Sequence, residues 1–212
     1  MYIKELVVRS QELVKKHKVI LSLSLAVFVT LSLYLFWDLP NPMRLSTNPP
    51  SASTKLLDRK GNLIYEIFFD QRRTPISLKT LPAHVINATL AAEDHDFYKH
   101  SGFSVRGIAR AFVNTFFRRS LQGGSTITQQ LVKNALLTQD RTVRRKIREF
   151  TLSMVVEMAY SKDQILEMYL NQVAYGGTAY GIESASKTYF GKSASELNLS
   201  ESSLLAGLPQ AP

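Results

Sequence analysis

The N-terminal part of the chain contains a long apolar run, from Val19 to Trp37, in which no residue carries a formal charge. As a helix this run would span roughly 28 Å, about the hydrocarbon thickness of a bilayer. Five basic and only two acidic residues precede it, which favours a cytoplasmic position for the N-terminal tail. The run is too long for the apolar region of a signal peptide, and no small-x-small cleavage site precedes Asp38. We therefore expect a tail at 1–18 and a membrane helix at 19–37, in preference to a cleaved signal or a buried core helix.

Polar and proline-rich residues follow the apolar run. Residues 38–54 contain four prolines together with several Ser, Thr and Asn residues, a composition typical of an extended linker. Two apolar runs then flank Lys60-Gly61-Asn62 within 55–69, which predicts a β-hairpin or a short strand pair.

From Leu81 onward the hydrophobic positions follow the period of helices. An apolar helix is expected from Val85 to Ala92, and three later segments repeat apolar residues at i, i+3 and i+4, which indicates one buried face on each. These three sets are Val105, Ile108, Ala109, Phe112, Val113 and Phe116; Val143, Ile147, Phe150, Met154 and Met158; and Ile165, Leu166, Tyr169, Leu170 and Val173. A capping box formed by Ser161 and Gln164 precedes the third set. The pattern predicts a mainly α-helical domain over 55–212, with a short β-hairpin.

Composition and charge narrow the possible functions. The 212 residues include no cysteine, which excludes a disulfide scaffold, a thiolate nucleophile and a zinc ribbon. The formal net charge is +9, and 21 basic and 15 acidic residues, a net +6, remain when residues 1–18 are set aside. We therefore expect an anionic partner such as nucleic acid, a membrane surface or a phosphorylated ligand.

A cluster of acidic and histidine side chains follows the apolar helix that ends near Ala92. It begins with Glu93 and Asp94 and continues to His100. A carboxylate beside apolar surface can accept a proton near neutral pH, whereas the simpler interpretation is a solvated helix end with local ion pairs. A metal site is less favoured, because the histidines lack the i, i+4 spacing of a helical ligand pair.

A glycine-rich loop precedes a second polar segment. Gly123 and Gly124 come before Ser125 and Thr126, and Thr126 has capping-box spacing to Gln129, which is followed by Gln130. Such a loop aims free backbone N–H groups at an anion, and Lys133, two turns along the helix, can reach a phosphate. The alternative is an ordinary capped helix, and the ending of a P-loop is absent.

Basic residues are dense between 106 and 148, where Asp140 is the single acidic residue. The cations are Arg106, Arg110, Arg118, Arg119, Lys133, Arg141, Arg144, Arg145, Lys146 and Arg148. Glu149 follows, and on a helix it shares a face with Arg145 and Lys146. An acid among cations can orient them or bind a divalent ion, whereas the simpler alternative is a surface ion pair or a solvated basic face.

Taken together, these stretches resemble the peptidoglycan glycosyltransferase family, glycosyltransferase family 51, over roughly 54–212. Its motif Glu-Asp-x-x-Phe-x-x-His-x-Gly matches Glu93 to Gly102, and Gly-x-Ser-Thr-Ile-Thr-Gln-Gln matches Gly123 to Gln130. Its motif Arg-Lys-x-x-Glu matches Arg145 to Glu149, and Lys-x-x-Ile-Leu-Glu-x-Tyr-Leu-Asn matches Lys162 to Asn171. The resemblance implies a lysozyme-like helical domain with a membrane-dipping lobe, for which the aromatic stretch 112–117 with its flanking arginines is suited.

The resemblance also implies a reaction and roles for residues. The substrate would be lipid II, which is polymerised by inverting glycosyl transfer with release of undecaprenyl pyrophosphate. The implied catalytic residues are Glu93, as general base, and Glu149, which would orient cations or hold Mg²⁺ or Mn²⁺. The implied substrate-binding residues are Lys133, Arg141 and Arg110, on the pyrophosphate, with Ser125, Thr126, Gln129, Gln130, Asp94, His100, Arg145 and Lys146.

Partners and alternatives follow from the same resemblance. The expected partners are lipid II, the nascent glycan and the membrane, and not nucleic acid. The expected location is the bacterial inner membrane, crossed once, with the N-terminus cytoplasmic and the catalytic domain outside. The signatures of a transpeptidase domain are absent, so we expect a truncated bifunctional protein or a glycosyltransferase-only form. A lysozyme-like lytic transglycosylase and a non-catalytic, membrane-anchored binder of anionic polymer remain the alternatives.

Overall fold

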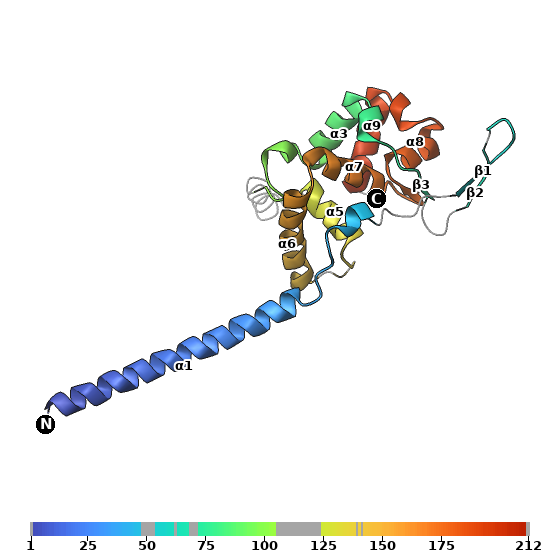
Figure 1. The fold of residues 1–212 in the computed structure, drawn as a ribbon. Helices are drawn as coiled ribbons and strands as arrows, with labels where there is room; N and C mark the ends of the chain where they lie inside the picture. Colours follow the sequence, from blue (N-terminus) through green and yellow to red (C-terminus); the bar gives the residue numbers. More distant parts are fainter. Residues whose placement is uncertain are drawn as a thin grey trace. The chain divides into compact units, whose positions relative to one another are not determined.

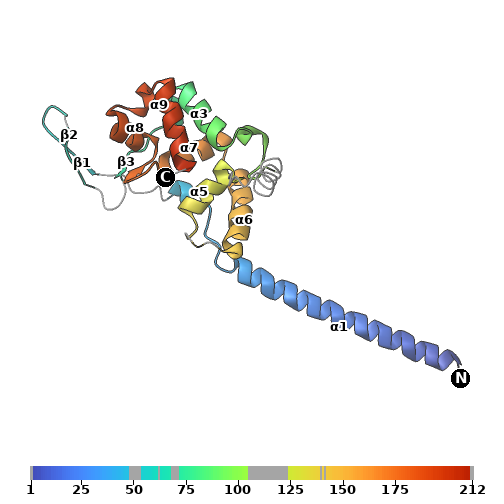
Figure 2. The same ribbon diagram turned by 180° about the vertical axis from the view of Figure 1, so that it is seen from behind.

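The computed structural model describes residues 2–47, 54–61, 63–67, 72–104, 124–138, 140 and 142–210. The chain divides into two compact units, Met1–Leu39 and Pro40–Pro212. Figures 1 and 2 show the helices of the second unit from opposite sides.

The first unit consists mainly of helix α1, Tyr2–Phe36. Within the described residues, one segment, Lys16–Phe36, is long and apolar enough to cross a membrane, with a mean hydropathy of 2.4. Its apolar side chains are exposed, for example Leu21 at 70% and Phe28 at 67%. The apolar run is thus helical as predicted, and its position in a membrane stays a prediction.

The second unit is mostly helical. Its α-helices are α2 (Arg44–Thr47), α3 (Ala83–Glu93), α5 (Ile127–Ala135), α6 (Val143–Ala159), α7 (Lys162–Gln172), α8 (Ile182–Phe190) and α9 (Leu199–Gly207). Single 3₁₀ turns lie at η1 (Leu78–Thr80), η2 (Phe97–Lys99), η3 (Ala194–Glu196) and η4 (Leu208–Gln210). This content confirms the predicted mainly α fold.

Two small sheets complete the second unit. Strands β1 (Thr54–Leu57) and β2 (Leu63–Ile67) pair antiparallel, with Thr54 opposite Ile67, which confirms the predicted hairpin. Strands β3 (Arg72–Arg73) and β4 (Ala179–Tyr180) pair in parallel, a short contact that the hydrophobic pattern did not predict.

The core forms around α7, which contacts α5, α6 and α8, while α3 packs on α9 (Figures 1 and 2). All five residues predicted as the buried face of this helix are buried: Ile165, Leu166, Tyr169, Leu170 and Val173. The capping box of Ser161 and Gln164 is also confirmed.

The prediction for the buried face of α6 is wrong. Val143 and Met158 are 79% and 87% exposed, and Ile147 is 37% exposed. The buried residues are Glu149, Leu152, Ser153 and Val156, on another face of the same helix. That face contains both polar and apolar residues. Glu149 and Ser153 can be buried there because Glu149 pairs with a charged residue and the Ser153 hydroxyl donates to the Glu149 carbonyl at 2.6 Å. Periodicity detects an apolar stripe but not which face the neighbouring helices cover.

Part of the segment expected to be an extended linker, 38–54, is folded. Residues 44–47 form α2, and Leu45 is only 4% exposed. The Tyr160 hydroxyl, at the end of α6, lies 3.0 Å from the Ser46 hydroxyl. Burial of one leucine and this hydrogen bond attach the segment to the second unit, whose boundary lies at Pro40.

Candidate functional site

Glu93 is the last residue of α3, and its side chain is half-buried. Its Oε2 accepts a hydrogen bond from Gln130 Nε2 at 2.5 Å. Its Oε1 is buried and has no hydrogen-bond partner among the described residues. Burial raises the pKa of Glu93; the Gln130 hydrogen bond opposes this and the charge of Asp94 adds to it. The arrangement leaves one carboxylate oxygen ready to accept a proton.

A second hydrogen bond orients the side chain of Gln130. The Tyr169 hydroxyl donates to Gln130 Oε1 at 3.4 Å, so the amide nitrogen is the atom that faces Glu93. Tyr169 and Tyr175 are both buried, and burial, followed by the charge of Glu93, raises the pKa of each hydroxyl. Glu93 therefore lies close to the buried residues Tyr169 and Tyr175, which limit the water around its carboxylate.

Asp94 and His100 connect the end of α3 to the start of α5. Asp94 is buried; its Oδ2 lies 2.9 Å from His100 Nε2 and accepts from the Ile127 backbone N–H at 3.1 Å. A carboxylate at the first turn of a helix interacts favourably with the helix dipole. The Asp94 carboxylate is thus directed toward the protein interior. The substrate-binding role expected for Asp94 and His100 stays a prediction.

The capping box predicted at the start of α5 is confirmed: the Thr126 hydroxyl accepts from the Gln129 N–H, and the Gln129 side chain accepts from the Thr126 N–H. Thr126 also donates to the Gly102 carbonyl at 2.8 Å. The expectation of free N–H groups for an external anion is wrong for Thr126, Ile127 and Gln129, because side chains of the protein already accept from each of them.

Gly102 joins the first motif to α6. Its φ is +87°, and a Cβ on it would lie 3.0 Å from the Ser153 carbonyl oxygen. A side chain at this position would be strained and would collide with backbone. The glycine thus allows the loop after Glu93 to lie directly against α6.

The predicted face shared by Arg145, Lys146 and Glu149 is confirmed. Glu149 is 2% exposed, and its Oε2 accepts from Arg145 Nη1 at 2.7 Å while its Oε1 accepts from Lys146. Lys146 Nζ also donates to the Ser125 hydroxyl at 3.3 Å. Lys146 therefore links the glycine-rich loop to α6, and Glu149 fixes two cations.

The fit of a metal ion at Glu149 is poor in this arrangement. Both of its carboxylate oxygens already accept from cationic groups, and a divalent ion would add positive charge beside them. Within the described part of the chain, no group of three or more His, Asp or Glu side chains could hold a metal ion.

The remaining predicted cations have different outcomes. Lys133 lies in the last turn of α5, half-buried, and no described residue forms a hydrogen bond or ion pair with its side chain. Arg110 and Arg141 lie outside the described residues, as do the predicted helix face at 105–116 and the aromatic stretch 112–117.

The side chains of the fourth motif, Lys162 to Asn171, make contacts within the fold. Lys162 pairs with Glu157 at 2.7 Å and lies 4.3 Å from the centroid of the Phe97 ring. Glu167 accepts from the Leu78 N–H at 2.7 Å, and Asn171 exchanges two hydrogen bonds with the backbone of Ile76. The role of Glu157 was not predicted, because a helix boundary lies between Glu157 and Lys162 and the i, i+3 and i, i+4 spacing of a single helix does not apply to the pair.

The sequence of this chain is similar to those of known proteins. A family model described as "Transglycosylase" matches residues 60–212. The chain is 45% identical over 197 residues to "Penicillin-binding protein 1A" of Aquifex aeolicus, covering 91% of this chain and 27% of that protein. It is 42% identical over 179 residues to the protein of that name from Rickettsia conorii, covering 82% and 22%. The chain thus spans about a quarter of the length of these relatives.

A solved structure, penicillin-binding protein 1A from Haemophilus influenzae, is also similar. Its sequence identity is 25% and its TM-score 0.35, with 77% of this chain and 15% of that chain covered.

Proposed function

Because this chain belongs to the transglycosylase family, we propose that it is a peptidoglycan glycosyltransferase that polymerises lipid II into glycan strands and releases undecaprenyl pyrophosphate. The observation that carries the proposal is the state of Glu93: a half-buried carboxylate with a raised pKa and one oxygen without a partner among the described residues. It lies inside the segment that the family model matches.

In the proposed reaction Glu93 is the general base. Its Oε1 takes the proton of the sugar 4-hydroxyl of the acceptor lipid II. The oxygen of this hydroxyl then attacks C1 of the terminal sugar of the growing chain. The bond from C1 to the pyrophosphate breaks, and its electron pair leaves with the undecaprenyl pyrophosphate. Attack from the face opposite the leaving group inverts the configuration at C1. The hydrogen bond from Gln130 keeps the carboxylate oriented while the proton moves.

Cationic residues are assigned to stabilise the leaving group. A pyrophosphate leaves as an anion, so it is stabilised by cations more than by a proton. Lys133 supplies one cation from α5, and Glu149 holds Arg145 and Lys146 in fixed positions on α6. Arg110 and Arg141 are proposed for the same role from the sequence alone.

No step of this mechanism passes through a metal ion. The geometry of Glu149 favours the orienting role over the metal-binding role, because both of its oxygens are engaged by cations. Participation of Mg²⁺ or Mn²⁺ in binding the diphosphate stays a prediction.

The carboxylates next to Glu93 in the motifs do not fit the acid pair of a glycoside hydrolase. Hydrolases of this kind use two carboxyl groups on the two sides of the scissile bond. Here Glu149 is paired with two cations, and Asp94 contacts Ile127 and His100, so neither of these two carboxylates is placed to be the second acid or base of a hydrolase.

We assign the protein to the bacterial inner membrane. In this assignment α1 crosses the bilayer once, the basic tail lies in the cytoplasm, and the second unit lies outside, next to its lipid-linked substrate. Lipid II and the nascent glycan are the proposed partners.

Incubation of the chain with lipid II in detergent tests the proposal. We expect glycan polymer from the wild type, and a loss of about 10²–10⁴-fold for Glu93→Gln with an unchanged circular dichroism spectrum. Glu196→Gln, a substitution of an exposed glutamate on η3, is the matched control and should polymerise normally. Shortening of preformed glycan would support a lytic enzyme instead, and retention of substrate without turnover would support a binder.

A further inference from the structure

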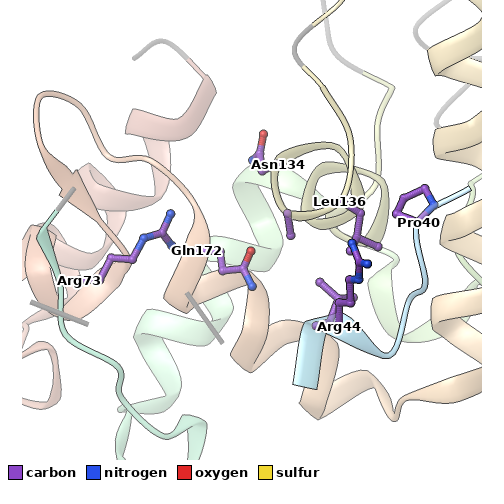
Figure 3. Close-up of a pocket in the computed structure, with 8 residues that line it drawn as sticks. Pro40, Arg44, Arg73, Asn134, Leu136 and Gln172 are labelled. Carbon is purple, nitrogen blue, oxygen red and sulfur yellow. The ribbon is translucent and has the colours of Figure 1, made fainter. Parts of the chain in front are cut away.

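The second unit contains a cavity of about 310 Å³ that lies between α2, β3 and the adjoining ends of α5 and α7. Figure 3 shows Arg73 and Arg44 reaching into this region from different elements, with Gln172 between them in that view. Its lining includes neither Glu93, nor Lys133, nor Glu149. The cavity is therefore separate from the residues assigned to the reaction.

The charge of this pocket is positive. Arg44 and Arg73 both line it, and none of the described residues that line it is acidic. Arg73 is held over the ring of Tyr180, with its guanidinium carbon 4.9 Å from the ring centroid. A guanidinium group stays protonated at any pH relevant here, so the pocket keeps two positive charges. Two cations that line one cavity, whose described lining residues include no carboxylate, attract an anion.

The uncharged lining narrows the chemistry of that anion. The side-chain amides of Asn134 and Gln172 can donate and accept hydrogen bonds, while Leu45 and Leu136 supply apolar surface. Leu45 is 4% exposed, so one wall is anchored in the fold. A volume of about 310 Å³ is in the range of small-molecule sites. The lining fits a phosphate with an attached ester group better than a bare ion.

The position of the pocket along the chain indicates where such a ligand would come from. Pro40 lines it as well, and Pro40 follows Trp37, the end of the apolar run, by three residues. Three extended residues span at most about 11 Å. If α1 crosses a bilayer, this short connection limits how far the rim of the pocket can lie from lipid headgroups.

We propose that the pocket formed by Arg44, Arg73, Asn134 and Gln172 binds the phosphate or diphosphate ester of a membrane lipid. This site goes beyond the proposed glycosyl transfer, because it shares no residue with the base or with the cations assigned to the leaving group. The arginines bind the phosphate oxygens, the amides bind the ester or hydroxyl oxygens, and the leucines contact the first carbons of the lipid.

Calorimetric titration of the full chain in detergent tests this site without any measurement of polymerisation. The probes are short-chain phosphatidic acid, short-chain phosphatidylcholine and inorganic pyrophosphate. We expect saturable binding of phosphatidic acid, and binding weaker by at least about tenfold for Arg44→Gln or Arg73→Gln. Arg59→Gln, a charge change on the exposed turn of the hairpin, is the matched control and should bind like the wild type.

A further variant guards against a loss of structure in the arginine substitutions. Ala135 lines the pocket from the exposed end of α5, so Ala135→Trp obstructs the cavity while both arginines remain. We expect it to weaken phosphatidic acid binding with an unchanged melting temperature. Unaltered binding in this variant and in Arg44→Gln would overturn the site. Pyrophosphate binding tighter than lipid, lost in the same variants, would overturn the lipid source, and equal binding of phosphatidylcholine would overturn the role of charge.

Discussion

Replacement of Gln130 by methionine tests how the base is tuned. Methionine has a similar length but no hydrogen-bond donor, so Gln130→Met removes the contact of 2.5 Å to Glu93 Oε2. That contact stabilises the ionised carboxylate and lowers the pKa of Glu93, against the larger effect of burial, which raises it. Its loss must raise the pKa further. Because a general base acts in its ionised form, the acidic limb of the activity profile should move to higher pH.

The size of the effect follows from the hydrogen bond. A hydrogen bond to a charged group contributes about 1.5–3 kcal/mol, and for the half-buried Glu93 we take the lower end because solvent weakens it. About 1.4 kcal/mol corresponds to a factor of ten. At a pH below the limb, Gln130→Met should therefore lose about tenfold in activity, and it should recover as the pH rises.

The measurement is the pH dependence of kcat/KM for polymerisation of lipid II. Tyr169→Phe removes the longer, neutral contact of 3.4 Å to Gln130 and should move the limb less, in the same direction. Tyr160→Phe, whose hydroxyl contacts Ser46 away from the site, should leave the profile unchanged. An acidic limb at the same pH in wild type and Gln130→Met, with equal melting temperatures, would refute the assignment of Gln130.

Four further predictions concern charge, backbone and membrane. Lys133→Ala should reduce polymerisation by about tenfold or more without a change in melting temperature, since a contact to phosphate contributes about 1.5–3 kcal/mol; normal turnover would place the leaving group elsewhere. Glu149→Gln should lower both activity and, in urea unfolding, stability by about 1–3 kcal/mol, because it frees two cations from a buried partner. Gly181→Ala should destabilise the protein by about 1–3 kcal/mol in the same assay, because a Cβ there would lie 2.9 Å from the Asn171 carbonyl oxygen at a φ of +82°. Gly207→Ala is the control: a Cβ at Gly207 meets no atom within 4 Å, so this variant should not destabilise the protein. Deletion of residues 1–37 should leave the circular dichroism of the second unit intact and reduce, but not abolish, polymerisation in detergent; an unfolded product would contradict the separation of the two units.

The helices that the sequence predicts correctly are those whose apolar face is also their buried face. On α7 the residues Ile165, Leu166 and Tyr169 are both apolar and buried, so the pattern and the packing agree. On α6 they disagree, because a fully paired Glu149 replaces an apolar side chain at the centre of the buried face. The contact of β3 with β4 joins residues more than a hundred positions apart, and strands of two residues leave no alternation to detect.

The candidate site could be predicted in its local parts. The capping box of Thr126 and the shared face of Arg145 and Glu149 depend only on spacing along one helix, and both are confirmed. The contact of Gln130 with Glu93 joins two helices, and the pocket at Arg44 and Arg73 joins a segment expected to be a linker to a short strand. No local pattern encodes such long-range pairs.

Hydrogen bonding distinguishes Glu93 from the other described acids that are buried. Asp94 and Glu149 each accept from at least two donors, and the same is true of Glu157 and Glu183, so their charges are compensated within the fold. Among the described residues, Glu93 Oε1 is the one buried carboxylate oxygen without a hydrogen-bond partner. Leaving such an atom unsatisfied costs about 1–3 kcal/mol, and most buried polar atoms are satisfied for that reason. Among the described residues the other buried acids are paired and this oxygen is open, so we assign it to the hydroxyl of the acceptor sugar in the proposed reaction.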